Sequence, residues 1–202
     1  MVVRSHLIEL PGQLILVDAQ LTASYAAEVL DCAAGLAKPI TRVYISHAHP
    51  DHFGGAGSIG APVYALATVR ARISQSGDLL LRRARMLTAG HDNGDIPARP
   101  SAIELIAQAG EEIIDGVRFS FEPVADAETS DPLTIRLPDE RILIAEDISS
   151  SNRTPPNSRT WPSSLSWRPD TTITAPDVPV RSRQFARSSS PGHSLTCRAV
   201  IL

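Results

Sequence analysis

Three histidines and an aspartate fall within six consecutive positions of this chain, in the stretch Ser46-His47-Ala48-His49-Pro50-Asp51-His52-Phe53-Gly54-Gly55. The stretch directly follows Val43-Tyr44-Ile45, a short apolar run typical of a buried strand. Imidazole nitrogens and carboxylate oxygens are ligands that Zn²⁺ and related divalent ions accept. The sequence therefore predicts a metal site at the end of a strand. The alternative interpretation is a histidine-rich surface loop.

The spacing within the motif divides its donors into two pairs. His47 and His49 alternate as strand residues do, so both side chains can face one ion. Asp51 and His52 follow where the chain turns, and we expect them to reach a second ion. The glycines at 54–55 allow the backbone to fold close to the site before the next helix.

The remainder of the first 150 residues alternates between strand and helix patterns. We expect a hairpin of Val2–Leu10 and Gln13–Val17, a helix over Thr22–Leu36, a strand at Pro62–Ala65, one or two helices over Leu66–Leu87 interrupted near Ser76-Gly77, and strands at Ile103–Ile106, Glu112–Ile114, Val117–Phe121, Leu133–Leu137 and Ile142–Ala145. Strand and helix in alternation, followed by a meander of strands, indicate a layered α/β (α+β) domain.

The charge of the chain changes abruptly near its last quarter. Residues 1–150 hold 12 basic and 20 acidic side chains, whereas residues 151–202 hold 7 basic and 2 acidic ones. The segment 150–202 is rich in Ser, Pro and Arg and shows no apolar period. We therefore predict a domain over residues 1–149 and a tail over 150–202 that is flexible or was created by a frameshift. Translating the gene in its other two frames would test the second reading.

Composition excludes several classes of function. A formal net charge of −3 argues against a nucleic-acid partner. The longest apolar runs are far shorter than the ~20 residues of a membrane span, and the start MVVRSHLIEL lacks the pattern of a secretory signal. Cys32 and Cys197 do not form a disulfide framework. We expect a cytoplasmic protein without membrane or nucleic-acid partners, acting on a small molecule, and the sequence leaves its oligomeric state open.

The stretch SHAHPDHFGG, with ILVDAQ upstream of it, resembles the metallo-β-lactamase fold superfamily of metal-dependent hydrolases. The resemblance covers about residues 5–150 and implies a four-layer αββα sandwich, incomplete at its C-terminus. It implies that His47 and His49 bind a first metal and that Asp51 and His52 bind a second. Asp147, in ILIAEDI, matches the bridging aspartate of the family.

Two other positions follow from the resemblance. Asp18 matches an aspartate that supports the ligands from behind without binding metal. Glu128 stands where the family has a third histidine, and a carboxylate can ligate Zn²⁺ or Fe²⁺. Asp126 and Asp131 are alternatives in the same turn, and this turn can also be interpreted as an acidic loop facing solvent.

The last histidine of the family has a counterpart in Pro191-Gly192-His193-Ser194, which lies 46 residues after Asp147. The resemblance implies that His193 binds the second metal. The helix and strand that precede this histidine in the family have no visible pattern here.

The implied activity is hydrolysis of an ester, thioester, lactone, lactam or phosphoester with one or two Zn²⁺ ions, Fe²⁺ and Mn²⁺ being possible replacements. A bound metal lowers the pKa of water from 15.7 toward roughly 7 and polarises the scissile group, and Asp51 is the expected catalytic residue that orients the water. The alternatives are an iron-containing oxidoreductase on the same fold and a truncated metal-binding protein without turnover.

Overall fold

The computed structural model describes residues 5–88, 95–105, 109–124, 132–145, 172–174, 183–185 and 197–201. Its elements, in chain order, are β1 (His6–Glu9), β2 (Leu14–Val17), α1 (Ala23–Ala34), β3 (Ile40–Tyr44), α2 (Pro50–Phe53), the 3-10 helix η1 (Gly54–Ser58), β4 (Val63–Ala65), α3 (Ala67–Leu87), β5 (Glu104–Leu105), β6 (Gly110–Ile114), β7 (Val117–Pro123), β8 (Leu133–Leu137), β9 (Ile142–Ile144), β10 (Thr172–Thr174), β11 (Arg183–Phe185) and β12 (Cys197–Ile201).

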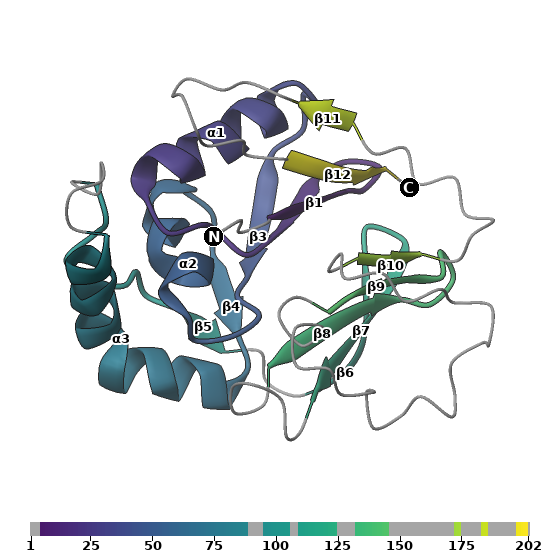
Figure 1. Ribbon diagram of the computed structural model, residues 1–202. Helices are drawn as coiled ribbons and strands as arrows, with labels where there is room; N and C mark the ends of the chain where they lie inside the picture. Colours follow the sequence, from purple (N-terminus) through teal and green to yellow (C-terminus); the bar gives the residue numbers. More distant parts are fainter. Residues whose placement is uncertain are drawn as a thin grey trace.

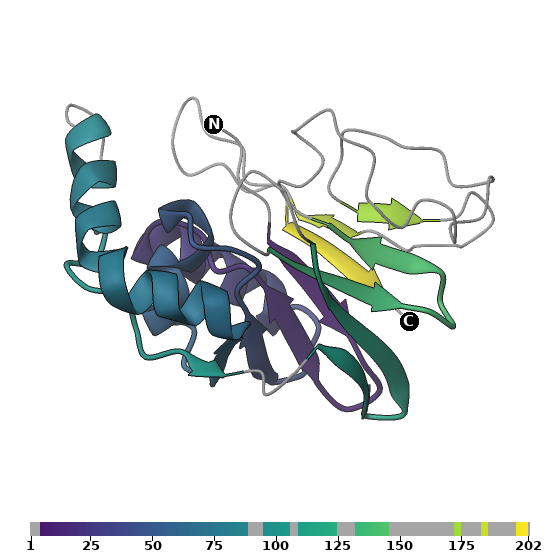
Figure 2. The same cartoon turned by 90° about the horizontal axis from the view of Figure 1, so that it is seen from below.

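Two sheets form the centre of the part of the chain that the structure describes. The first has the order β11-β12-β1-β2-β3-β4-β5, and the second has the order β10-β9-β8-β7-β6. The pairs β2–β3, β3–β4 and β4–β5 of the first sheet are parallel and the pair β1–β2 is antiparallel, whereas all pairs of the second sheet are antiparallel. The helices α1, α2 and α3 lie on one face of the first sheet, and the second sheet lies on the other (Figures 1 and 2).

Three layers of the expected αββα sandwich are thus present in the described ranges: helices, first sheet and second sheet. A helical layer outside the second sheet is not among these ranges. Large apolar side chains from both sheets fill the space between them, since Val17 and Tyr44, which share a face of the first sheet, and Phe119 and Leu137 of the second are buried. One hydrophobic core therefore joins the two sheets.

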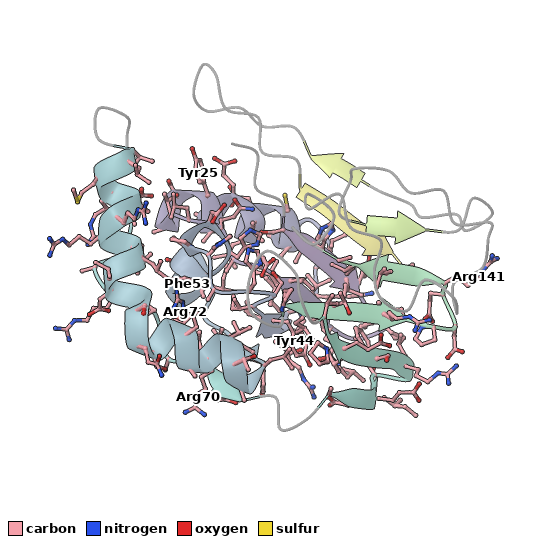
Figure 3. All side chains as sticks on the ribbon, turned by 60° about the horizontal axis from the view of Figure 1, so that its bottom comes forward. Tyr25, Tyr44, Phe53, Arg70, Arg72 and Arg141 are labelled. Atoms are coloured by element: carbon pink, nitrogen blue, oxygen red, sulfur yellow. The ribbon has the colours of Figure 1, made fainter. Side chains whose placement is uncertain are left out.

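Aromatic side chains connect the two sheets. The Tyr44 ring on β3 lies 4.9 Å from the Phe121 ring on β7, between centroids, and Figure 3 shows Tyr44 between the two sheets. Arg42 of β3 donates a hydrogen bond of 2.8 Å to Oε1 of Glu112 on β6. Burial of Tyr44 raises the pKa of its phenol, an effect that the nearby Arg42 guanidinium opposes.

The expected hairpin and first helix are confirmed. β1 and β2 pair antiparallel around the turn at Pro11-Gly12. Thr22 caps α1, because its side-chain oxygen accepts a hydrogen bond of 3.1 Å from the backbone N–H of Tyr25. The later strands of the meander are also found within one or two residues of their expected bounds.

The region Leu66–Leu87, expected as one or two helices, forms the single helix α3, which bends sharply near its middle (Figure 1). Gly77 is buried against Pro100, and a Cβ atom added at Gly77 would lie 2.8 Å from the ring of that proline. After His49 the donor stretch turns into the short helix α2, which begins at Pro50, and η1 follows directly.

Strands β10, β11 and β12 lie within the segment expected to be a tail. β12 pairs in parallel with β1, and β10 pairs antiparallel with β9. Backbone from this segment therefore extends both sheets. The division at residue 149 stays a prediction.

Candidate metal centre

The ends of two neighbouring strands bring the site together. β2 and β3 are parallel and in register at Val17 and Tyr44, and the backbone N–H of Asp18 donates to the carbonyl of Tyr44 over 2.9 Å. Because parallel strands end at the same edge of a sheet, Asp18 and Ser46 meet there. The histidine-rich stretch then passes over this edge toward α2.

His47 and His49 form the first pair of donors. The Nε2 atom of His47 lies 2.9 Å from the Nδ1 atom of His49, and the two rings are nearly perpendicular at a centroid distance of 4.5 Å. His47 is buried, with 2% of its surface exposed. Two imidazole nitrogens that face each other in this way can direct lone pairs at one metal ion.

Asp51 and His52 form the second pair, on helix α2. The Nε2 atom of His52 lies 3.9 Å from Oδ2 of Asp51, and the side chain of Asp51 is the more exposed of the two. The rings of His47 and His52 are 4.1 Å apart between centroids, so the two pairs adjoin. The donor types are those that zinc and iron sites use.

Asp18 lies behind these donors, as expected from the sequence. It is fully buried, and its Oδ2 atom lies 2.7 Å from Nδ1 of His52 and 2.7 Å from Oγ of Ser46. Burial alone would raise the pKa of this carboxyl group, but His52, His47 and the backbone N–H of Ser46 together hold that pKa below its usual value. Asp18 is therefore a carboxylate at neutral pH.

The backbone of the motif is fixed by close packing against the segment after β2. The N–H of Ala19 donates to the carbonyl of His52 over 2.7 Å, and the N–H of Gly55 donates to the carbonyl of Gln20 over 2.8 Å. A Cβ atom added at Gly55 would lie 2.3 Å from the carbonyl oxygen of Ala19, and one at Gly54 would lie 2.2 Å from that of Leu21. Only glycine allows this approach.

The structure brings together four of the seven residues expected to bind metal. Within the described ranges, no group of three or more His, Cys, Asp or Glu side chains is arranged to hold a metal ion. The remaining expected ligands Glu128, Asp147 and His193, and the alternatives Asp126 and Asp131, lie outside the described residues. The two pairs fit a metal site in donor chemistry, and each needs further ligands to reach four-coordination.

No expectation from the sequence included Ser46, yet its hydroxyl lies between Asp18 and His47. The signal in the sequence is its position, directly before the first histidine and at the end of the strand that adjoins β2.

Known proteins are similar to this chain in sequence and fold. The family model described as the metallo-beta-lactamase superfamily matches residues 1–189. The "Alkyl/aryl-sulfatase BDS1" of Saccharomyces cerevisiae (strain ATCC 204508 / S288c) is 28% identical over an alignment of 176 residues that covers 71% of this chain and 27% of that protein.

Solved structures of other proteins are also similar to this chain. A double mutant of the sec-alkyl sulfatase PisA1 is 26% identical, with a TM-score of 0.53, over 70% of this chain and 28% of the other. The native FEZ-1 metallo-beta-lactamase of Legionella gormanii is 18% identical with a TM-score of 0.50, over 66% of this chain and 50% of the other, and shares the fold. The chain thus spans between a quarter and a third of the length of the two sulfatases. With the family model covering most of its length, this chain belongs to the metallo-β-lactamase superfamily.

Proposed function

We propose that this chain is a hydrolase of sulfate esters that depends on divalent metal bound at two adjoining pairs of donors, His47 with His49 and Asp51 with His52. The observation that carries the proposal is the adjoining arrangement of these four donors at the edge of the first sheet. The chain belongs to the metallo-β-lactamase superfamily, and two of the relatives are named as alkyl sulfatases. This similarity favours sulfate esters over the other ester classes.

The residues of the chain have distinct tasks in this proposal. His47 and His49 offer neutral nitrogens, and Asp51 offers a carboxylate at the exposed side of the cluster. When bound there, a divalent metal acidifies a water molecule and polarises the bond to be cleaved. Asp51 would orient this water and accept its proton, and His52 beside it would help to hold the metal.

The metal and the remaining ligands belong to the same proposal. We favour one or two Zn²⁺ ions, with Fe²⁺ or Mn²⁺ as the other candidates, because nitrogen and carboxylate donors suit all three. Asp147 and Glu128 would complete the coordination, with His193 at the second metal. The substrate is a small molecule, and no membrane or nucleic-acid partner is required.

Substrate hydrolysis tests the proposal. The purified chain is stripped with a chelator, reloaded with Zn²⁺, Fe²⁺ or Mn²⁺, and offered a secondary alkyl sulfate, an aryl sulfate, a carboxylic ester, a thioester, a lactone, a β-lactam and a phosphoester. We expect sulfate release from the reloaded wild type and at least about a hundredfold loss in His49→Ala and Asp51→Asn. Asp78→Asn, at an exposed carboxylate of α3, is the control.

Two outcomes would contradict the proposal. Sulfate release that persists in the stripped His49→Ala protein would exclude a metal-dependent mechanism at this site. Cleavage of another ester class without any sulfate release would retain the hydrolase and remove the sulfatase assignment.

A further inference from the structure

Ser46 is held in place by the two sheets at once. It is buried, its backbone N–H donates to Oδ1 of Asp18 over 2.8 Å, and its carbonyl accepts from the N–H of Leu133 at the start of β8 over 2.8 Å. Its hydroxyl therefore has a fixed location between Oδ2 of Asp18, at 2.7 Å, and Nδ1 of His47, at 2.9 Å.

The number of hydrogens on each group determines which atom donates in the two hydrogen bonds of the Ser46 hydroxyl. A hydroxyl carries one hydrogen, and a carboxylate can only accept. The hydroxyl of Ser46 must then donate to Asp18, and its oxygen can only accept from His47. The hydrogen of neutral His47 consequently resides on Nδ1, and the lone pair resides on Nε2, the atom that faces Nδ1 of His49.

The same carboxylate determines the state of the third histidine. The Nδ1 atom of His52 lies 2.7 Å from Oδ2 of Asp18, so this nitrogen carries the hydrogen. The lone pair of neutral His52 is then on Nε2, the atom on the side of Asp51. Asp18 thus orients His52 directly, whereas the hydroxyl of Ser46 lies between Asp18 and His47.

We propose that Ser46 is a positioning residue for His47. Its hydroxyl donates to Asp18 and accepts from Nδ1 of His47, and this arrangement keeps Nε2 of His47 as the nitrogen available to a metal. The inference rests on the proposed function, because it assigns His47 a ligand role. Outer-shell partners of ligating histidines fix their tautomer and ring orientation, and their loss lowers metal affinity roughly 10–100-fold.

Removal of the hydroxyl has a defined consequence. In Ser46→Ala, Asp18 loses one donor and Nδ1 of His47 loses its acceptor, so both tautomers of His47 become populated. Ser46→Thr retains a hydroxyl at the same place. Ser120→Ala is the matched control, since it deletes a buried hydroxyl of the second sheet that bonds to Oε1 of Glu122.

Zinc affinity is the first readout, measured on the purified full chain by competition with a chelator. Ser46→Ala is expected to bind Zn²⁺ about 10–100-fold more weakly than the wild type, while Ser46→Thr stays stronger than Ser46→Ala and Ser120→Ala is unchanged. Ser46→Ala with wild-type affinity would overturn the inference, as would a threonine variant as weak as the alanine variant.

The tautomer of His47 is the second readout and needs neither metal nor turnover. In the metal-free wild type, the ¹⁵N chemical shifts of His47 should show a protonated Nδ1 and an unprotonated Nε2, whether or not the variants fold. A hydrogen on Nε2 would overturn the inference. If the wild type shows the expected tautomer and binds no zinc, the proposed function fails and the orientation by Ser46 stands.

Discussion

At the residue scale, Asp18 is the group on which the candidate site depends most. It is fully buried, and it accepts hydrogen bonds from the backbone and hydroxyl of Ser46 and from Nδ1 of His52. A buried carboxylate without such donors is strongly destabilising. The same bonds that orient the histidines therefore also compensate the cost of burying this charge.

The pH dependence of stability follows from the lowered pKa of Asp18. The folded chain favours the ionised form, so this group stabilises the fold above its unfolded pKa of about 3.9, and the contribution disappears as pH falls through the lower folded pKa. In Asp18→Asn, we expect a loss of about 3 kcal/mol in the free energy of unfolding at pH 7.

Denaturant unfolding of the metal-free proteins between pH 7 and pH 2.5 measures this effect. The difference between wild type and Asp18→Asn should narrow below about pH 4. A difference that stays constant over the whole range would show that the carboxylate is not ionised in the folded chain.

The clustering of the four candidate donors could be predicted from the sequence, because they fall within six consecutive positions. The role of Ser46 could not, since the hydroxyl acts through Asp18, which is 28 positions away in the chain. Only the parallel pairing of β2 with β3 brings these two residues together.

At the element scale, the helix α1 and the 3-10 helix η1 approach each other closely. A Cβ atom at Gly55 would lie 2.8 Å from the carbonyl oxygen of Thr22 and 2.9 Å from Cβ of Ala26. Gly55→Ala should therefore destabilise the fold by about 1–3 kcal/mol, as overpacked substitutions do, and weaken metal binding by displacing α2.

Gly57→Ala is the control for this prediction, because it lies on the exposed side of the same 3-10 helix with its nearest neighbour atom at 3.5 Å. Its free energy of unfolding should change by no more than about 0.5 kcal/mol. Equal effects of the two substitutions, measured by denaturant unfolding, would mean that the close approach is not what requires glycine.

Aromatic side chains contribute to the contact between the two sheets. Phe121 is buried and its ring contacts Tyr44, whereas the ion pair of Arg42 and Glu112 is partly exposed to solvent. Phe121→Ala should cost about 3–5 kcal/mol of unfolding free energy, and Glu112→Gln at most about 1 kcal/mol. If Glu112→Gln is the more damaging change in denaturant unfolding, this ranking is wrong.

Elements with strong local signals could be predicted, and those that depend on distant contacts could not. Thr22 and the apolar spacing after it predict α1 from neighbouring residues alone. Gly77 gives a local signal for a break in the helix, but its contact with Pro100, more than 20 positions away, uses the absence of a side chain for packing. The spacing of residues in the sequence does not predict the contact between Gly77 and Pro100.

At the scale of the whole molecule, β12 covers one edge of β1. The two strands pair in parallel from His6 to Glu9, and Leu7 and Ile8 of β1 are fully buried. Deleting residues 183–202 would expose the backbone donors and acceptors of this edge, which favours aggregation. We expect a lower midpoint of thermal unfolding and aggregates in size-exclusion chromatography.

The deletion also tests the tail predicted for residues 150–202. A shortened chain that unfolds at the same temperature as the full chain and stays monodisperse would support a dispensable tail. A destabilised chain would place residues 183–202 within the domain.

None of the described helices is long and apolar enough to span a bilayer. The candidate metal centre lies at the edge of the first sheet where β2 and β3 end. The central claim is that the histidine pair at this edge holds a metal ion.

Metal content measured by mass spectrometry tests this claim most directly. The full chain, His47→Ala, His49→Ala and the control Asp78→Asn are dialysed against a slight excess of Zn²⁺ and then against metal-free buffer, with folding checked by circular dichroism. We predict at least one zinc ion per chain in the wild type and the control, and a loss of most of the zinc in both histidine variants. Folded histidine variants with the zinc content of the wild type would contradict the claim.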